Sequence, residues 1–342
     1  GLDSNYIQKK IDSIMTLGIK ENAFPGAQLL VAKNNKIIFH QSYGYHTYDS
    51  IQKVALNDIY DLASVTKIIG PLPALMKLYD EGKLDLDVPF SSYWKSWKHR
   101  KDKNNITLRE LLAHQSGLQP YIVFLNEVLK KGKLNRRFAR HIKSKRFPNQ
   151  AYSNIYINKR FKKKAFRIIK LSKVSGDKTY KYSGLASLIY PQLIENITGI
   201  TYTTYLQKNF YRPIGCNTLG YLPMSKGFKN SIVPTEKDSL FRKTLTKGWV
   251  HDENAALLGG ISGNAGLFGT ASDLAKLMQM YLQKGIYNGK RYITEVTLNE
   301  FSKIQYPKNN NRRGLGFDKP LIGNDTLSIK KAYPAPEVNA AS

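Results

Sequence analysis

The sequence predicts an α/β fold of the α+β type, in which an antiparallel sheet is flanked by helices and accompanied by a helical region. Residues 4–23 carry apolar side chains at helical spacing, which indicates an amphipathic helix. Residues 27–43 form two strand-like stretches around the pair Asn34–Asn35, which indicates a β-hairpin. Mostly helical segments and long loops follow, without an internal repeat. We therefore expect residues 1–342 to form a single domain.

Composition limits the chemistry that the chain can perform. Hydrophobic residues make up 42% of the 342 residues, which is enough for a sizeable core, and no run of 18 apolar residues indicates a membrane-spanning helix. The one cysteine, Cys216, excludes an internal disulfide and a cysteine metal cluster. None of the six histidines pairs with another at metal-ligand spacing. We expect neither a metal nor a cofactor.

Positive charge is concentrated in one block. The formal net charge is +28, and residues 130–181 hold 19 lysines and arginines against one acid, Asp177. Such a block can bind an anionic wall polymer, anionic lipid or nucleic acid, or can be an ordinary solvated surface. No helix-turn-helix, zinc-finger or ribonucleoprotein signature accompanies it, so we do not expect nucleic acid as a partner.

A serine three residues before a lysine occurs five times. The pairs are Ser50/Lys53, Ser64/Lys67, Ser92/Lys95, Ser175/Lys178 and Ser328/Lys331. Only Ser64 stands between an apolar lead-in and a long segment with helical periodicity, which places it near a helix N-terminus with Lys67 one turn on. Pro71 and Pro73 predict a kink or a late start of that helix.

This pair is suited to nucleophilic catalysis. A serine hydroxyl is a poor nucleophile until a neighbouring base takes its proton, and a lysine can serve as that base. The helix start also favours developing negative charge. The alternative is an N-cap serine beside a solvated lysine. Local sequence leaves both interpretations open.

Later segments predict further elements. Thr107 and Glu110 form a capping box at the start of a helix, and His114 is expected to fix the loop after it. A helix is expected at 183–197, and Ser272 with the following aspartate opens another after the glycine-rich residues 255–269. The stretch His-Asp-Glu-Asn at 251–254 is a capped loop or, as the alternative, a cation ligand set.

Five of these segments, in this order, resemble the serine β-lactamase-like family of class C β-lactamases, DD-peptidases and related esterases. They are FPGAQLLVAKNNKIIFHQSYGY, YDLASVTK, ITLRELLAHQSGL, YSGLASLIYPQLIENITG and GGISGNAGLFGTASDLAKLMQMYL. The segment GLGFDKP, from residue 314, is similar to the branch fused to family 3 glycoside hydrolases in Bacteroidetes. The resemblance covers nearly the whole chain and implies a β-lactamase/transpeptidase-like fold.

The resemblance also implies a mechanism and its residues. Ser64 would attack an acyl carbonyl, Lys67 would support the proton-accepting network, and a tyrosine would act as general base and acid. Tyr182 matches that tyrosine because an apolar helix ending in Thr-Gly follows it, whereas Tyr152, in a literal Tyr-Ser-Asn, lacks that context. Residues 119–181 then form an enlarged basic insertion.

Two departures from the family pattern affect activity. Gly184 stands where the family has Asn or Asp, so it offers no side chain to the lysine or to a substrate amide. No Lys/His-Thr/Ser-Gly segment occurs, although its strand completes the family's oxyanion hole. We expect the sheet's C-terminal strands to be missing from residues 1–342, and a following segment or a second chain to supply them.

Two functions therefore remain open. The first is a serine hydrolase that forms an acyl-enzyme on Ser64 with a D-amino-acid peptide, an ester or a β-lactam. The second is a weak or inactive module of the same fold that binds an anionic cell-wall polymer through residues 130–181. The resemblance implies a periplasmic or secreted protein.

Overall fold

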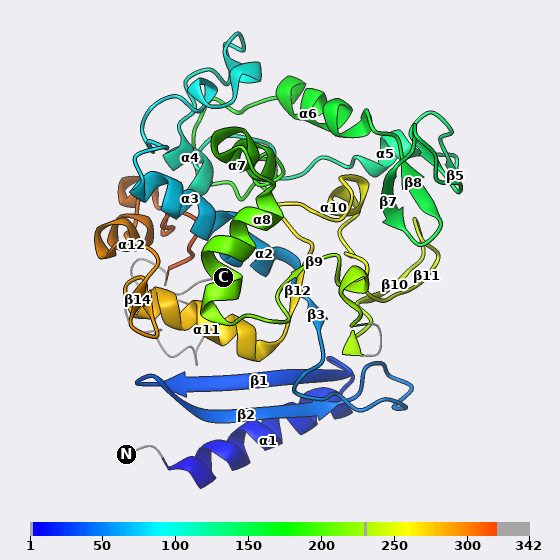
Figure 1. Cartoon of the computed structure of the whole chain (residues 1–342), viewed down its shortest axis with the longest axis vertical. Coiled ribbons are helices and arrows are strands. Elements are labelled where there is room, and N and C mark those ends of the chain that lie inside the picture. The colour runs from blue at the N-terminus through cyan, green and yellow to red at the C-terminus, as the bar shows by residue number, and fades with distance from the viewer. Residues whose placement is uncertain (1–2, 229–230, 320–342) are drawn as a thin grey trace.

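The computed structural model describes residues 3–228 and 231–319. A hairpin of β1 (Gly26–Lys33) and β2 (Lys36–Gly44) lies between α1 (Ser4–Lys20), which packs on β2, and α11 (Ala271–Leu282), which packs on β1 (Figure 1). The remaining helices and short strands lie on the α11 side of the hairpin. The predicted helix at 4–23 and hairpin at 27–43 are thus confirmed.

The hairpin turn follows from its asparagines. Asn34 and Asn35 have φ of 48° and 64°, and two left-handed residues are what a tight two-residue hairpin turn requires. The strands pair antiparallel from Gly26–Gly44 to Lys33–Lys36. The strands expected after residue 342 lie outside the described residues.

A small sheet holds the segment that contains Ser64. Its central strand is β12 (Leu267–Gly269), which pairs antiparallel with β3 (Tyr60–Asp61) on one side and with β9 (Gly220–Tyr221) on the other. Three strands that are distant in the sequence therefore pair directly before the serine.

The helix that follows Ser64 is broken, as its prolines predict. A 3-10 helix, Ala63–Val65, leads into α2 (Thr66–Ile69), and α3 (Pro71–Asp80) begins after Gly70. Gly70 has φ of −102° and ψ of −92°, outside helical values. Proline lacks an N–H, so it is tolerated at the start of α3 and would disrupt the interior of a continuous helix. Both helices are mostly buried.

The helix expected at 183–197 begins later than predicted. It is α7 (Tyr190–Thr198), ended by Gly199 with φ of 72°. Upstream of it, two backbone N–H groups donate hydrogen bonds to acceptors outside a helix. The Ser183 N–H donates to the His114 Nδ1 at 3.2 Å, and the Gly184 N–H donates to the Pro120 oxygen at 3.1 Å. These bonds hold the start of the segment against the 114–120 loop.

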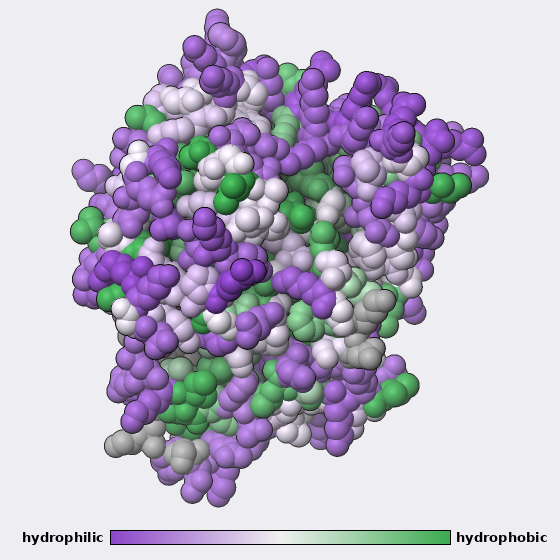
Figure 2. Space-filling model, viewed as in Figure 1, coloured by the Kyte–Doolittle hydropathy of each residue, from purple (hydrophilic) through white to green (hydrophobic). Residues whose placement is uncertain are grey.

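Residues 119–181, which the sequence predicts to be an insertion, fold into short helices and strands beside α10 (Glu253–Leu257). Its elements are α5 (Leu125–Val128), β4 (Leu129–Lys130), β5 (Lys133–Leu134), β6 (Ala139–Arg140), β7 (Asn149–Tyr152), β8 (Ile155–Ile157) and α6 (Phe161–Leu171). Strands β6, β8 and β7 make a three-stranded antiparallel sheet. Every lysine and arginine from 130 to 181 is exposed or half-buried, so the predicted basic surface is confirmed. Figure 2 shows hydrophilic side chains over this region, at the upper right.

The other elements complete the cover around the core. They are α4 (Leu108–Leu112), α8 (Tyr202–Leu206), α9 (Arg212–Ile214), α12 (Glu295–Ser302), β10 (Glu236–Asp238), β11 (Thr244–Thr246), β13 (Ile286–Tyr287), β14 (Lys290–Arg291), a π-helix Gln207–Tyr211 and the 3-10 helices Phe90–Ser92, Lys95–Trp97, Pro223–Lys226 and Pro307–Asn309. The capping box of Thr107 and Glu110 opens α4 as predicted. Within the described ranges, no helix is both long and apolar enough to cross a bilayer.

Candidate active site

Ser64 and Lys67 form a direct hydrogen bond. The Lys67 Nζ lies 2.7 Å from the Ser64 Oγ, and the same amine donates to the Asn264 backbone oxygen at 3.2 Å. Ser64 is exposed and Lys67 is half-buried. The serine is therefore open to a substrate while the amine behind it is held by two oxygens.

Asp61 fixes the backbone in front of the serine. Its buried carboxylate accepts hydrogen bonds from the Ala63 N–H at 3.0 Å and from the His251 N–H at 2.8 Å. The His251 ring also lies 3.0 Å from Asp61, and this hydrogen bond raises the pKa of His251. Ala63 has φ of 45°, a left-handed value that a residue with a Cβ adopts only where its surroundings impose it. The turn before Ser64 is thus held by hydrogen bonds of Asp61 to Ala63 within the turn and to His251 outside it.

The glycine-rich loop places Asn264 beside the lysine. Gly263 packs so closely on the segment that precedes α7 that a Cβ there would lie 2.2 Å from the Ser187 oxygen. The Ser262 Oγ donates to the Asn264 Oδ1 at 2.7 Å, which fixes the asparagine within the loop. Close packing that only glycine permits therefore brings the Asn264 carbonyl to Lys67.

Tyr182 lies against the same lysine. The Lys67 Nζ is 5.5 Å from the centroid of the Tyr182 ring, within the range of a cation–π interaction. The ring is 42% exposed and packs on His114, with centroids 4.4 Å apart. Among the described residues the Tyr182 hydroxyl makes no hydrogen bond, so its contact with Lys67 runs through the ring face.

Tyr152 has a different environment. It lies in β7, where its ring packs on Trp249 with centroids 5.6 Å apart. Of the two tyrosines that the sequence offers, the structure brings Tyr182 to Lys67.

His114 has a structural role, as the sequence predicts. It is buried with φ of 54°, and its Nδ1 accepts the hydrogen bond from Ser183. Burial, together with the positive charges of Arg313 and Lys67, lowers the pKa of His114 to about 3. The imidazole is therefore neutral near pH 7 and acts as an acceptor that holds the Tyr182 segment.

Sequence reasoning missed two contributors to the site. Arg313, which is 4% exposed, lies with its guanidinium 5.7 Å from the Tyr182 ring centroid, and nothing in its local sequence signals this. Asn264 lies in a loop whose clearest sequence feature is its glycines. Asp252 caps α10 through a bond from Ala255, so the expected capped loop at 251–254 is confirmed. Within the part of the chain that the structure describes, no His, Cys, Asp and Glu side chains gather into a metal site.

Comparison with known proteins agrees with this architecture. The family model described as "Beta-lactamase" matches residues 7–321. An N-acetylmuramyl-L-alanine amidase of Bacillus subtilis (strain 168) is 30% identical over 319 residues, which are 86% of this chain and 67% of the relative. A protein of Salmonella heidelberg (strain SL476) whose proposed activity is D-alanyl-D-alanine carboxypeptidase is 29% identical, over 87% of this chain and 67% of its own length.

Solved structures share the fold. A class C β-lactamase from Rhodobacter sphaeroides superposes with a TM-score of 0.64 at 14% identity, covering 96% of this chain and 82% of its own. The octameric penicillin-binding protein homologue from Pyrococcus abyssi gives 0.62 at 19% identity, covering 86% and 59%. The predicted β-lactamase/transpeptidase-like fold is confirmed, and the chain belongs to the beta-lactamase family.

Proposed function

We propose that the protein is a serine hydrolase that works through an acyl-enzyme on Ser64. The observation that carries this proposal is the 2.7 Å hydrogen bond between the Ser64 Oγ and the Lys67 Nζ. An exposed hydroxyl and a half-buried amine at this distance form a nucleophile and its proton acceptor. Membership of the beta-lactamase family and the amidase and carboxypeptidase names of its relatives support it.

The proposed steps use the three side chains in turn. The Ser64 Oγ bonds to the substrate carbonyl carbon while its proton passes to the amine of Lys67. The carbonyl oxygen gains charge beside the Ser64 backbone N–H, which serves as an oxyanion donor. The C–N or C–O bond then breaks, and the leaving amine or alcohol takes the proton through Tyr182. Water hydrolyses the resulting ester by the reverse proton path.

We propose cell-wall D-amino-acid peptides or wall-linked esters as the substrate class, with β-lactams as a lesser one. Gly184 supplies no side-chain amide where the family has Asn or Asp, and this favours esters over amides and β-lactams. A periplasmic or secreted location fits such substrates. Affiliation with the branch fused to family 3 glycoside hydrolases rests on residues 314–320 and stays a prediction.

A kinetic experiment tests this proposal. Release of D-alanine from a D-alanyl-D-alanine peptide and hydrolysis of a thioester of the same acyl group would be measured for the wild type, Ser64→Ala and Lys67→Ala. Both variants should lose activity to a similar extent, because residues that act as a unit are not additive. Hydrolysis that survives in Ser64→Ala would refute the proposal.

The second candidate is a catalytically weak module that binds an anionic cell-wall polymer. The observation that favours it is the basic surface of residues 130–181, on which Lys164 and Lys178 pair with carboxylates while most other cations form no ion pair within the described residues. Retention of a wall polymer by wild type and Ser64→Ala alike, with no turnover by the wild type, would favour this candidate. The affinity should fall steeply with salt because bound counterions are released.

A further inference from the structure

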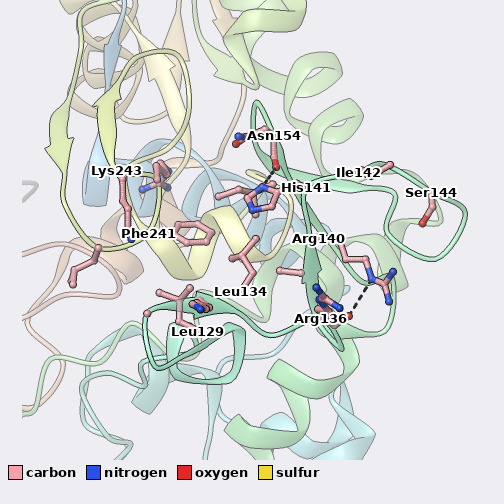
Figure 3. A pocket seen from close by; sticks show the side chains of 16 residues that line it. Leu129, Leu134, Arg136, Arg140, His141, Ile142, Ser144, Asn154, Phe241 and Lys243 are labelled. Carbon is pink, nitrogen blue, oxygen red and sulfur yellow. Dashed lines mark hydrogen bonds between the residues drawn. The ribbon is translucent and has the colours of Figure 1, made fainter.

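A hollow in the insertion is separate from the Ser64 site. Its volume is about 850 Å³, within the size range of small-molecule pockets. Three parts of the chain surround it: residues 129–144, residues 154–155 and the turn 240–243 (Figure 3). None of its lining residues lines the small hollow that Lys67, His114 and Tyr182 share. A ligand here would therefore not contact the proposed catalytic residues.

The floor of the hollow is apolar. Leu129 and Leu134 are cross-strand partners in β4 and β5, and Ile155 and Phe241 are 3% and 5% exposed. Figure 3 shows Leu129, Leu134 and Phe241 gathered toward the middle of the view. Such a floor removes an apolar ligand body from water.

Two large aliphatic side chains extend the apolar surface to the rim. Ile142 is 78% exposed and Leu240 is 67% exposed, and both line the hollow. Covering them with an apolar partner would contribute about 25 cal/mol of binding free energy for every Å² of apolar surface removed from water. The position of both at the mouth of one hollow indicates an apolar partner.

The rim is cationic. Lys133, Arg136, Arg140 and Lys243 are exposed and line the hollow, and none of them forms an ion pair with a described residue. No aspartate or glutamate contributes to the lining as far as the chain is described. Arg242 also lines it, but its charge is neutralised by Asp238 at 3.0 Å. The hollow thus combines an uncompensated positive rim with an apolar floor.

We propose that this hollow binds an amphiphilic anion, with its hydrocarbon chain on the Leu129, Leu134 and Phe241 floor and its phosphate-type head group on Arg136, Arg140 and Lys133. Guanidinium groups suit this head group because their planar donors match phosphate oxygens. A polymer that carries only charge would leave the floor and the exposed aliphatic side chains in water. No exposed Phe, Tyr or Trp side chain lines the hollow within the described chain, so the stacking platform typical of single-stranded nucleic-acid binding is missing.

Calorimetric titration of the intact chain with monomeric dodecyl phosphate tests the proposal. Dodecyl maltoside supplies the same chain without charge, and inorganic triphosphate supplies charge without a chain. Dodecyl phosphate should bind with one-to-one stoichiometry, and each partial ligand should bind at least about tenfold more weakly, a loss of about 1.4 kcal/mol or more.

Variants locate the binding. The double variant Lys133→Glu/Arg136→Glu and the double variant Ile142→Ser/Leu240→Ser change only exposed side chains at the mouth, and each should weaken binding about tenfold or more. The matched control Lys163→Glu/Lys173→Glu carries the same charge change on exposed positions outside the hollow and should leave the affinity unchanged.

Two results would overturn the proposal. Triphosphate binding as tight as that of dodecyl phosphate, with equal losses in the control, would mean general attraction of the basic surface for polyanions. Adhesion to vesicles of anionic phospholipid without binding of monomeric dodecyl phosphate would mean a membrane-facing surface rather than a discrete site. Unchanged far-ultraviolet circular dichroism of each variant would show that it is folded.

Discussion

The buried histidine next to Tyr182 makes the fold sensitive to acid. His114 accepts a hydrogen bond from Ser183, packs on the Tyr182 ring and is exposed to the positive charges of Lys67 and Arg313. Burial and these charges lower its pKa from the ordinary 6.5 to about 3. Protonation would place a third positive charge in the site and remove the acceptor for Ser183. Folding therefore disfavours the protonated imidazole.

The sign and size of the effect follow from proton linkage. Between pH 6.5 and 3 the unfolded chain binds a proton at this position and the folded chain does not. The free energy of unfolding thus falls as pH drops, by about 1.4 kcal/mol per unit from this residue. At pH 5 the loss is about 2 kcal/mol, a large part of the stability of an ordinary domain.

Urea unfolding at pH 7, 6, 5 and 4 would measure this loss against a matched variant. His114→Asn is suitable because His114 has φ of 54° and asparagine tolerates the left-handed conformation while offering an acceptor to Ser183. The wild type should lose about 2 kcal/mol more than the variant between pH 7 and pH 5. Parallel pH profiles for the two proteins would refute the reasoning.

Three further predictions concern residues around the site. Tyr182→Phe should lower turnover by about 10²–10⁴-fold if its hydroxyl carries protons, and Tyr152→Phe should leave turnover unchanged; the reverse ranking would overturn the assignment. Gly184→Asn should leave the urea midpoint of unfolding unchanged, because a Cβ there meets nothing within 4 Å. The same variant should raise the rate of acylation by a β-lactam up to about tenfold, which corresponds to the free energy of one hydrogen bond. A lowered urea midpoint would contradict the prediction that the asparagine fits. Gly263→Ala should lower the free energy of unfolding by about 1–3 kcal/mol, because its Cβ would lie 2.2 Å from the Ser187 oxygen; a stability equal to wild type would show that the loop is not packed as described.

Local signals predicted much of the fold. The Asn34–Asn35 turn, the capping box at Thr107 and the break before Pro71 each depend on residues close in the chain, and each is confirmed. The predicted start of α7 at residue 183 was wrong, because acceptors distant in the sequence bind the N–H groups of Ser183 and Gly184.

The site was predicted in the same uneven way. The contact of Ser64 with Lys67 could be predicted because the two residues stand three positions apart, at the start of one segment with helical periodicity. Asn264 and Arg313 lie about 200 or more positions after Lys67 in the sequence. The packing of the glycine-rich loop brings Asn264 to Lys67, and Arg313 packs against the Tyr182 ring. Periodicity along a sequence carries no information on such contacts.

The central claim is that Ser64 is the nucleophile, and covalent labelling tests it most directly. The chain would be incubated with a fluorophosphonate, its intact mass measured, and the modified peptide mapped. We expect one adduct per chain, located on Ser64, and no adduct on Ser64→Ala. A label on another serine, such as Ser50 or Ser92, or equal labelling of Ser64→Ala, would contradict the account.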